Sequence, residues 1–171
     1  MSDDKEDTQK INAPPPAAVP KPVEPTTPPP KPDVLCVDDE PFILEGLAVN
    51  LRRHFNVTTS DSPEDALMIL QTENGAKISI ILSDMRMPGM DGATFLERAC
   101  RIRPNAVRML LTGHADLDAT IKAVNEGQIF KYVSKPCPAK KLIEIFKEAH
   151  NEFLRVEAET EILKQTLRGS V

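Results

Sequence analysis

Residues 78–84 read ISIILSD, and residues 85–92 continue as MRMPGMDG. The run ISIIL is apolar without the alternation of a half-buried strand, which is typical of a strand covered on both faces of a parallel sheet. A sheet of this kind carries helices on both faces, so the stretch predicts an α/β fold. Asp84 then stands at the carboxyl end of a buried strand, where ligands bind in open α/β sheets. The stretch therefore predicts a fold class and a first candidate functional residue.

Short apolar runs and amphipathic stretches alternate on both sides of this strand. Four further runs are expected as strands: DVLCV at 33–37, FNVTT at 55–59, VRMLLT at 107–112 and FKYVS at 130–134. Five stretches are expected as helices: 41–54, 63–73, 92–102, 116–127 and a long segment from Ala139. Strict alternation predicts a doubly wound, five-stranded parallel sheet. We expect the strand order 2-1-3-4-5, which makes the first and third strands neighbours.

Polar residues with related chemistry follow four of the predicted strands. They are Asp38 and Asp39 after the first strand, Asp84 at the end of the third, Thr112 at the end of the fourth and Lys135 after the fifth. Three neighbouring carboxylates repel one another, and a hard cation such as Mg²⁺ relieves that repulsion. A carboxylate can also accept a phosphoryl group, whose oxygens a lysine and a hydroxyl can contact. Taken singly, each acid could instead be a helix cap or a solvated loop charge.

Four motifs in this region give the chain a resemblance to a known family. VLCVDDEP at 34–41, LSDMRMPGMDG at 82–92, LLTGHAD at 110–116 and FKYVSKP at 130–136 are similar to motifs of the receiver domains of two-component response regulators. The resemblance covers residues 33 to about 150 and implies a flavodoxin-like fold. It also implies a partner, a histidine kinase or a histidine phosphotransfer protein, that donates a phosphoryl group.

The resemblance assigns a role to each residue that matches a family motif. Asp84 resembles the phosphorylated aspartate, and Lys135 the lysine that contacts phosphate. Asp39 resembles the direct Mg²⁺ ligand, Asp38 its partner acid, and the main-chain carbonyl of Arg86 the third protein ligand. Thr112 resembles the switch hydroxyl and Tyr132 the aromatic ring that moves with it. The Lys135–Pro136 peptide bond is expected to be cis, as in receiver domains generally.

Composition limits the remaining functions. A net charge of −5 and a pI near 5.3 argue against a broad nucleic-acid-binding surface. The chain contains no apolar run of membrane-spanning length, and the acidic start MSDDKEDTQK is not a secretory signal. Three widely spaced cysteines fit neither a disulfide framework nor a zinc site, which favours the cytoplasm. Residues 1–32 are rich in proline and are expected to form a disordered tail.

The last predicted helix carries a second pattern. Apolar residues recur in alternating four- and three-residue steps, a heptad a/d seam: Leu142, Phe146, Ala149, Phe153, Val156, Thr160, Leu163 and Leu167. We expect residues 33–150 to be the receiver domain and residues 151–171 to extend its last helix as a coiled-coil linker in a parallel homodimer. The linker resembles those that precede phosphodiesterase domains of the HD-GYP type. The alternative is an amphipathic helix that folds back on its own domain.

Three functions follow from these observations. The leading hypothesis is a Mg²⁺-dependent phosphoacceptor that switches its surface and dimer state, with no output enzyme domain within the chain. A scaffold that dimerises independently of phosphorylation is the alternative. A phosphatase that uses Asp84 as its nucleophile is disfavoured, because such enzymes usually place an acid two residues later, where this chain has Arg86.

Overall fold

The central sheet has the predicted order. The computed structural model describes residues 28–113 and 129–169. Five parallel strands are arranged as β2-β1-β3-β4-β5, with bounds Asp33–Val37 (β1), Asn56–Ser60 (β2), Ile78–Asp84 (β3), Val107–Thr112 (β4) and Lys131–Ser134 (β5). The predicted helix at 116–127 and most of the expected tail at 1–32 lie outside the described residues.

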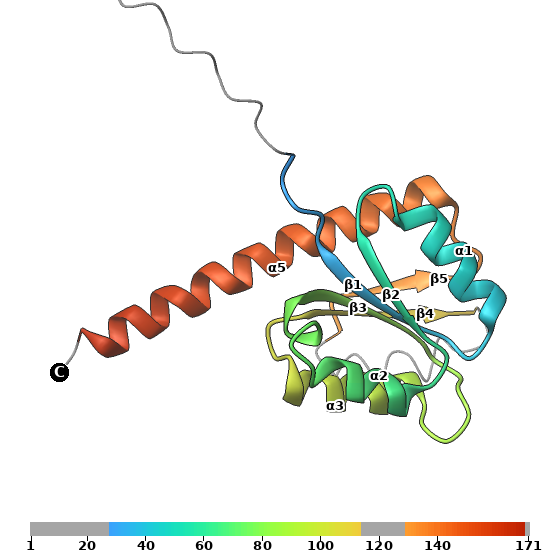
Figure 1. Cartoon of the computed structure of the whole chain (residues 1–171), viewed down its shortest axis with the longest axis horizontal. Helices are drawn as coiled ribbons and strands as arrows, with labels where there is room; N and C mark the ends of the chain where they lie inside the picture. Colours follow the sequence, from blue (N-terminus) through green and yellow to red (C-terminus); the bar gives the residue numbers. More distant parts are fainter. Residues whose placement is uncertain (1–27, 114–128, 170–171) are drawn as a thin grey trace, which may run out of the picture.

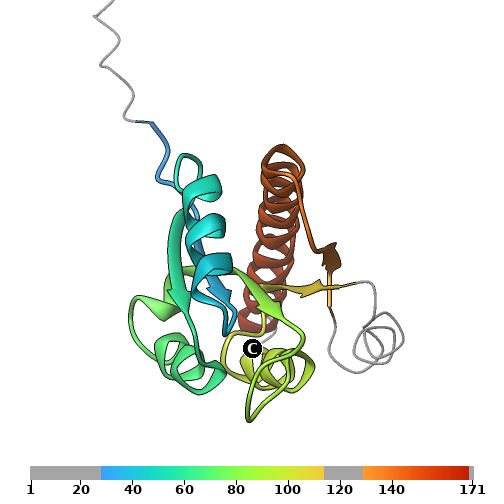
Figure 2. The same cartoon turned by 90° about the vertical axis from the view of Figure 1, so that its right-hand side faces the viewer.

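The described helices cover both faces of the sheet (Figures 1 and 2). They are α1 (Pro41–Leu51), α2 (Pro63–Leu70), α3 (Gly92–Ile102) and α5 (Ala139–Arg168), with a short 3₁₀ turn at Gly75–Lys77. Predicted helices at 41–54 and 63–73 end three residues earlier than expected. The first ends early because Phe55 turns into the core, where it is buried and packs edge-on against Phe146.

Side chains on the two faces of the sheet form two separate cores. One core joins α1 and α5 to the sheet and includes Leu47, Met109 and Phe146. The other joins α2 and α3 to the opposite face and includes Ile81 and Phe95. All seven residues of β3 are buried, as expected for the central strand of a doubly wound sheet.

Strand register brings the candidate site residues to one edge of the sheet. Val37, the residue before Asp38, pairs with Ser83, the residue before Asp84. Asp84 pairs with Leu111, the residue before Thr112. Thr112 pairs with Ser134, the residue before Lys135. Four strands therefore end at one level, and the polar residues that follow them are neighbours although they are far apart in the sequence.

The last helix is continuous over 30 residues, from Ala139 to Arg168. Its first half packs on the sheet, and its second half extends past the edge of the domain (Figure 1). The predicted seam does not serve one purpose along this length, because Leu142, Phe146 and Ala149 are buried in the domain's own core. The first half of the seam therefore belongs to the receiver core, and the helix extension after residue 150 carries the rest of it. No helix among the described residues is long and apolar enough to cross a membrane.

Candidate functional site

Three carboxylates meet where β1 and β3 end. One carboxylate oxygen each from Asp38, Asp39 and Asp84 can be chosen so that all lie within 4.8 Å of one another. Asp38 is 0% exposed and Asp84 is 6% exposed, while Asp39 is partly exposed. Such crowding is unfavourable for three ionised groups unless a positive charge is close by.

Lys135 supplies the positive charge that the described residues bring to this cluster. Its ammonium Nζ lies 2.9 Å from Oδ1 of Asp84 and 3.1 Å from Oδ2 of Asp38. Its backbone N–H donates to the carbonyl of Thr112 at 2.8 Å, which ties the loop after β5 to the end of β4. The Lys135–Pro136 bond is cis, as predicted.

Burial and hydrogen bonds act in opposite directions on the ionisable groups here. Burial raises the pKa of Asp38, although the backbone N–H of Glu40 and the ammonium of Lys135 donate to its carboxylate and lower it in part. Burial alone would lower the pKa of Lys135, but its hydrogen bonds to Asp84 and Asp38 outweigh that effect and raise it. Lys135 is therefore a cation at neutral pH.

The chain leaves β3 through a tight passage beside Asp84. The N–H of Gly92 donates to the carbonyl of Met85 at 2.8 Å. A Cβ atom at residue 92 would lie only 2.0 Å from the carbonyl oxygen of Asp84, so the position requires glycine. Gly89 takes a φ of +80° in the same loop. These glycines shape the loop that holds Asp84 at the surface edge.

The remaining predicted site residues lie at the end of β4, on β5 and in the loop after β3. Thr112 is buried, and its hydroxyl donates to the carbonyl of Gly113 at 3.1 Å. Tyr132 is half-buried on β5, and Arg86 lies with an exposed side chain in the loop after β3.

The donor set at this edge fits a hard divalent cation. It consists of carboxylate oxygens, without a thiolate or imidazole among the three clustered side chains. Oxygen-only ligands are those of Mg²⁺ rather than of softer metals. Three acids against one lysine also leave negative charge for a cation to neutralise.

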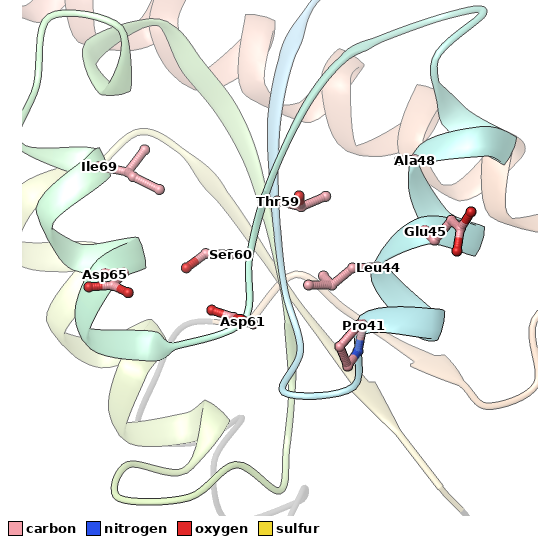
Figure 3. A pocket seen from close by; sticks show the side chains of 9 residues that line it. All are labelled: Pro41, Leu44, Glu45, Ala48, Thr59, Ser60, Asp61, Asp65 and Ile69. Atoms are coloured by element: carbon pink, nitrogen blue, oxygen red, sulfur yellow. The ribbon is translucent and has the colours of Figure 1, made fainter.

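Two cavities lie beside this cluster. A groove of about 570 Å³ crosses the outer strand β2, between side chains of α1 and α2 (Figure 3). Its lining includes Leu44, Thr59 and Asp65 but none of the clustered acids, so its size does not make it the reactive site. A smaller, mainly apolar groove of about 360 Å³ runs along α1 to Lys135 and Pro136.

Comparison with known proteins identifies the family. Residues 34–147 match the family model of the response regulator receiver domain. The chain therefore belongs to the response regulator receiver family. The match includes all five strands, except for the first residue of β1, and every residue of the acid–lysine cluster.

Individual relatives agree with this assignment. The hydrogenase transcriptional regulatory protein HoxA of Bradyrhizobium diazoefficiens is 36% identical over 75% of this chain and 26% of its own length. The chain thus spans about a quarter of that curated relative. A solved receiver domain from Clostridium thermocellum is 36% identical, with a TM-score of 0.64 over 70% of this chain and 94% of that one. A structure titled adenylate cyclase from Rhodopirellula baltica is 36% identical, with a TM-score of 0.73 over 78% of this chain and 98% of that one.

These findings confirm the predicted fold and the predicted class of function. The chain carries a receiver domain, the phosphoacceptor module of two-component signalling. Receiver domains bind Mg²⁺ at an acidic pocket, and the chain has an aspartate cluster at the corresponding edge of its sheet. The names of its relatives describe transcriptional regulators, whose DNA-related roles belong to those longer proteins.

Proposed function

We propose that this protein accepts a phosphoryl group on Asp84 from a histidine kinase or a histidine phosphotransfer protein, and that it is not an enzyme acting on a separate substrate. The observation that carries the proposal is the position of Asp84, nearly buried yet in contact with Lys135 and clustered with two further acids. In this reaction an oxygen of Asp84 attacks the phosphorus of a phosphohistidine. The P–N bond breaks, an acyl phosphate forms, and the released histidine nitrogen takes a proton from solvent, so that the donor leaves as imidazole.

The surrounding residues have separate tasks in this proposal. Asp39, Asp38, Asp84 and the main-chain carbonyl of Arg86 would hold Mg²⁺, which supplies positive charge against the phosphoryl oxygens when bound. Lys135 can exchange its contact with Asp84 for a phosphoryl oxygen, because its ammonium already lies beside the reacting carboxylate. The hydroxyl of Thr112 would turn from the carbonyl of Gly113 toward the phosphoryl group.

Movement of Thr112 gives the proposed switch its structural basis. Thr112 on β4 pairs with Ser134 on β5, two residues after Tyr132. A shift of the hydroxyl toward Asp84 leaves space that the half-buried ring of Tyr132 can fill. The phosphoryl group would thereby favour one of two arrangements of the β5 surface, a shift of population between existing states.

The apolar groove along α1 is suited to contact the phosphoryl donor. It extends from Phe42, which is 86% exposed, to Lys135 at the reactive edge. An exposed aromatic side chain beside an apolar groove is a typical anchor for a protein partner. Replacing Phe42 with Ala should slow transfer from a phosphohistidine protein but leave labelling by acetyl phosphate unchanged, because the small donor does not need the groove.

We also propose that residues 33–150 act as the receiver unit and that residues 151–171 mediate self-association. The free thiols of Cys36, Cys100 and Cys137 suit the reducing cytoplasm, where we place the protein. Exposed Leu163 and Leu167 support a homodimer through the helix extension. A parallel dimer, as expected from the sequence, would use the part of the seam beyond the receiver, because the domain itself covers Leu142, Phe146 and Ala149.

Intact-mass spectrometry after incubation with acetyl phosphate tests the phosphoacceptor proposal. With Mg²⁺ the wild-type chain should gain one phosphoryl group, and excess EDTA should prevent the gain. Asp84→Asn should stay unlabelled while it keeps the wild-type circular dichroism spectrum, because amide and carboxylate have nearly the same shape. Full labelling of Asp84→Asn would refute the assignment, and an unlabelled wild type whose self-association ignores the donor would favour the phosphorylation-independent scaffold.

A further inference from the structure

The apolar stripe of α5 serves two different environments. Ala149 is buried in the receiver core, and Phe153 packs against that core at its margin. The same four- and three-residue spacing continues through Val156, Thr160, Leu163 and Leu167, so these side chains project from the same side of the helix. Val156 and Thr160 are half-buried, whereas Leu163 and Leu167 are 63% and 73% exposed. The stripe therefore points toward the space beside the domain and becomes exposed past the edge of its sheet.

This direction restricts how a second copy can pair with the stripe. Packed helices lie about 8–10 Å apart, and the first half of α5 already contacts β3 and β4 on that side. In a straight parallel pair, the partner's residues 139–153 would continue into the volume that this sheet occupies. Neither glycine nor proline interrupts α5 between Ala139 and Arg168, so the helix has no residue that would bend it away. Side-by-side parallel pairing is thus blocked by the receiver itself.

An antiparallel arrangement removes this conflict. The C-terminal end of the partner's helix then points toward the receiver of the first copy. The partner's receiver lies beyond Arg168 of the first copy. Val156 of one copy faces Leu167 of the other, and Thr160 faces Leu163. The half-buried residues of each copy therefore cover the exposed leucines of the other. The paired segment, from Val156 to Arg168, is about 20 Å long at 1.5 Å per residue.

Charges that flank the stripe favour the same orientation. Flanking residues of a coiled coil contact the partner in a pattern that depends on helix direction. Antiparallel pairing places Glu157 opposite Lys164 of the other copy, twice by symmetry. Parallel pairing would place Glu159 opposite Lys164, but it would also place Glu152 opposite Glu157, which is repulsive. Within its own chain Lys164 has no ion-pair partner among the described residues, so its charge is available to a second copy.

We propose that the protein forms an antiparallel homodimer through Val156, Thr160, Leu163 and Leu167 of α5, with Glu157 and Lys164 of opposite copies paired. The inference rests on the homodimer proposed above and replaces parallel pairing by the opposite orientation. The two receivers stand at opposite ends of the paired segment, each with its acid cluster open to a donor. Because the paired segment is short, we expect a dissociation constant on the order of tens of micromolar, which means weaker association than in obligate dimers.

Disulfide trapping in the full chain tests the orientation. Cys100 and Cys137 are replaced by Ser, while the buried Cys36 is kept. A chain with Val156→Cys and a mass-tagged chain with Leu167→Cys are mixed above the dissociation constant and oxidised, and the products are identified by intact mass. The antiparallel dimer predicts the mixed disulfide, between residue 156 of one copy and residue 167 of the other. Two residues with the same number lie about 16 Å apart along the helix axis in this dimer, which is too far for a disulfide. Ile162→Cys, on the other side of the helix, measures the rate of random collisions.

Each outcome of the trapping experiment decides between the proposals. Mixed disulfide well above the collision rate supports the antiparallel dimer. Predominant disulfides between equal positions would show a parallel dimer, which overturns the orientation but leaves the homodimer in place. Both the orientation and the homodimer would be overturned if disulfides formed only at the collision rate and the chain sedimented as a monomer at roughly 100 µM, which is above the expected dissociation constant.

Charge exchange gives an independent test by analytical ultracentrifugation. Glu157→Lys should weaken the antiparallel dimer several-fold, and adding Lys164→Glu should restore it. In a parallel dimer the single change would instead tighten association, since it removes the repulsion from Glu152. Glu157 also accepts a hydrogen bond from Asn105 of its own chain at 2.6 Å. Asn105→Ala, which loses that bond but keeps the charges, is therefore the matched control and should associate like the wild type.

Discussion

The ammonium of Lys135 lies 2.9 Å from a carboxylate oxygen of Asp84, and 3.1 Å from one of Asp38. One lysine thus compensates two nearly buried acids that belong to different strands. Asp38 is fully buried, so the loss of its cation leaves a charge that water cannot reach. The pair that is suited to bind a phosphoryl group is also the contact that makes this edge of the sheet stable.

Replacing Lys135 with Met should therefore lower stability as well as labelling. In EDTA we expect the free energy of unfolding to fall by about 1–3 kcal/mol, because buried carboxylates lose their partner. Mg²⁺ should restore much of this loss, since a divalent cation can take over the compensation. Urea denaturation with and without Mg²⁺ measures both effects. An equal loss in the two conditions would mean that the cation does not bind beside these acids.

Replacing Asp39 with Ala should have the opposite effect on stability. Without Mg²⁺ the variant should be more stable by roughly 0.5–1 kcal/mol, because one of three repelling carboxylates is gone. The wild type should gain stability when Mg²⁺ is added, and the variant should gain little. Thermal unfolding over a Mg²⁺ titration tests this, with Asp33→Ala as a control acid at the other end of β1. A variant that Mg²⁺ stabilises as strongly as the wild type would exclude Asp39 as a ligand.

Replacing Gly92 with Ala should disturb the site through the backbone. The added methyl would meet the carbonyl oxygen of Asp84 at 2.0 Å, so the loop has to shift, at a cost of about 1–3 kcal/mol. Labelling should slow as well, because Asp84 moves with the loop. Gly46→Ala is the matched control: no atom lies within 4 Å of its added methyl, and an alanine in α1 should stabilise by about 0.5–1 kcal/mol. Equal stability of the two variants would contradict the close approach at Gly92.

His150 should make the junction between receiver and helix extension sensitive to acid. Burial lowers its pKa, its Nδ1 has no hydrogen-bond partner among the described residues, and its ring stacks on Phe153. Below about pH 6.5 the unfolded chain therefore takes up a proton that the folded chain resists, and stability falls as the pH falls.

Urea denaturation at pH 7.5 and 5.5 measures this dependence. His150→Gln should lose less stability over this range than the wild type, whereas His54→Gln, a change at an exposed position, should lose as much. Other acids titrate in all three proteins, so the comparison isolates the histidine. If the stability of His150→Gln fell as steeply with falling pH as that of the wild type, burial of the histidine would have no energetic consequence.

Local pattern was sufficient to predict the sheet and the reactive edge. The apolar run at 78–84, which lacks alternation, requires a strand whose two faces are both buried. Strands that alternate with helices along the chain must run parallel. Once the strands are parallel, residues that follow their carboxyl ends share one edge. This is why Asp38, Asp84, Thr112 and Lys135 could be grouped from the sequence, and why the family motifs fell on the same positions.

Tertiary structure decided what spacing could not. A heptad pattern marks one side of a helix, but it does not reveal whether a sheet or a second helix covers that side, since both require the same apolar residues. The heptad pattern of α5 runs without a break, and it is packing that commits Leu142, Phe146 and Ala149 to the receiver core and leaves Leu163 and Leu167 exposed. Likewise, the ends of α1 and α2 depended on where the chain had to turn into the core. The order of residues along the chain determines the spacing of apolar side chains on a helix. Only the folded structure determines which other side chains they contact.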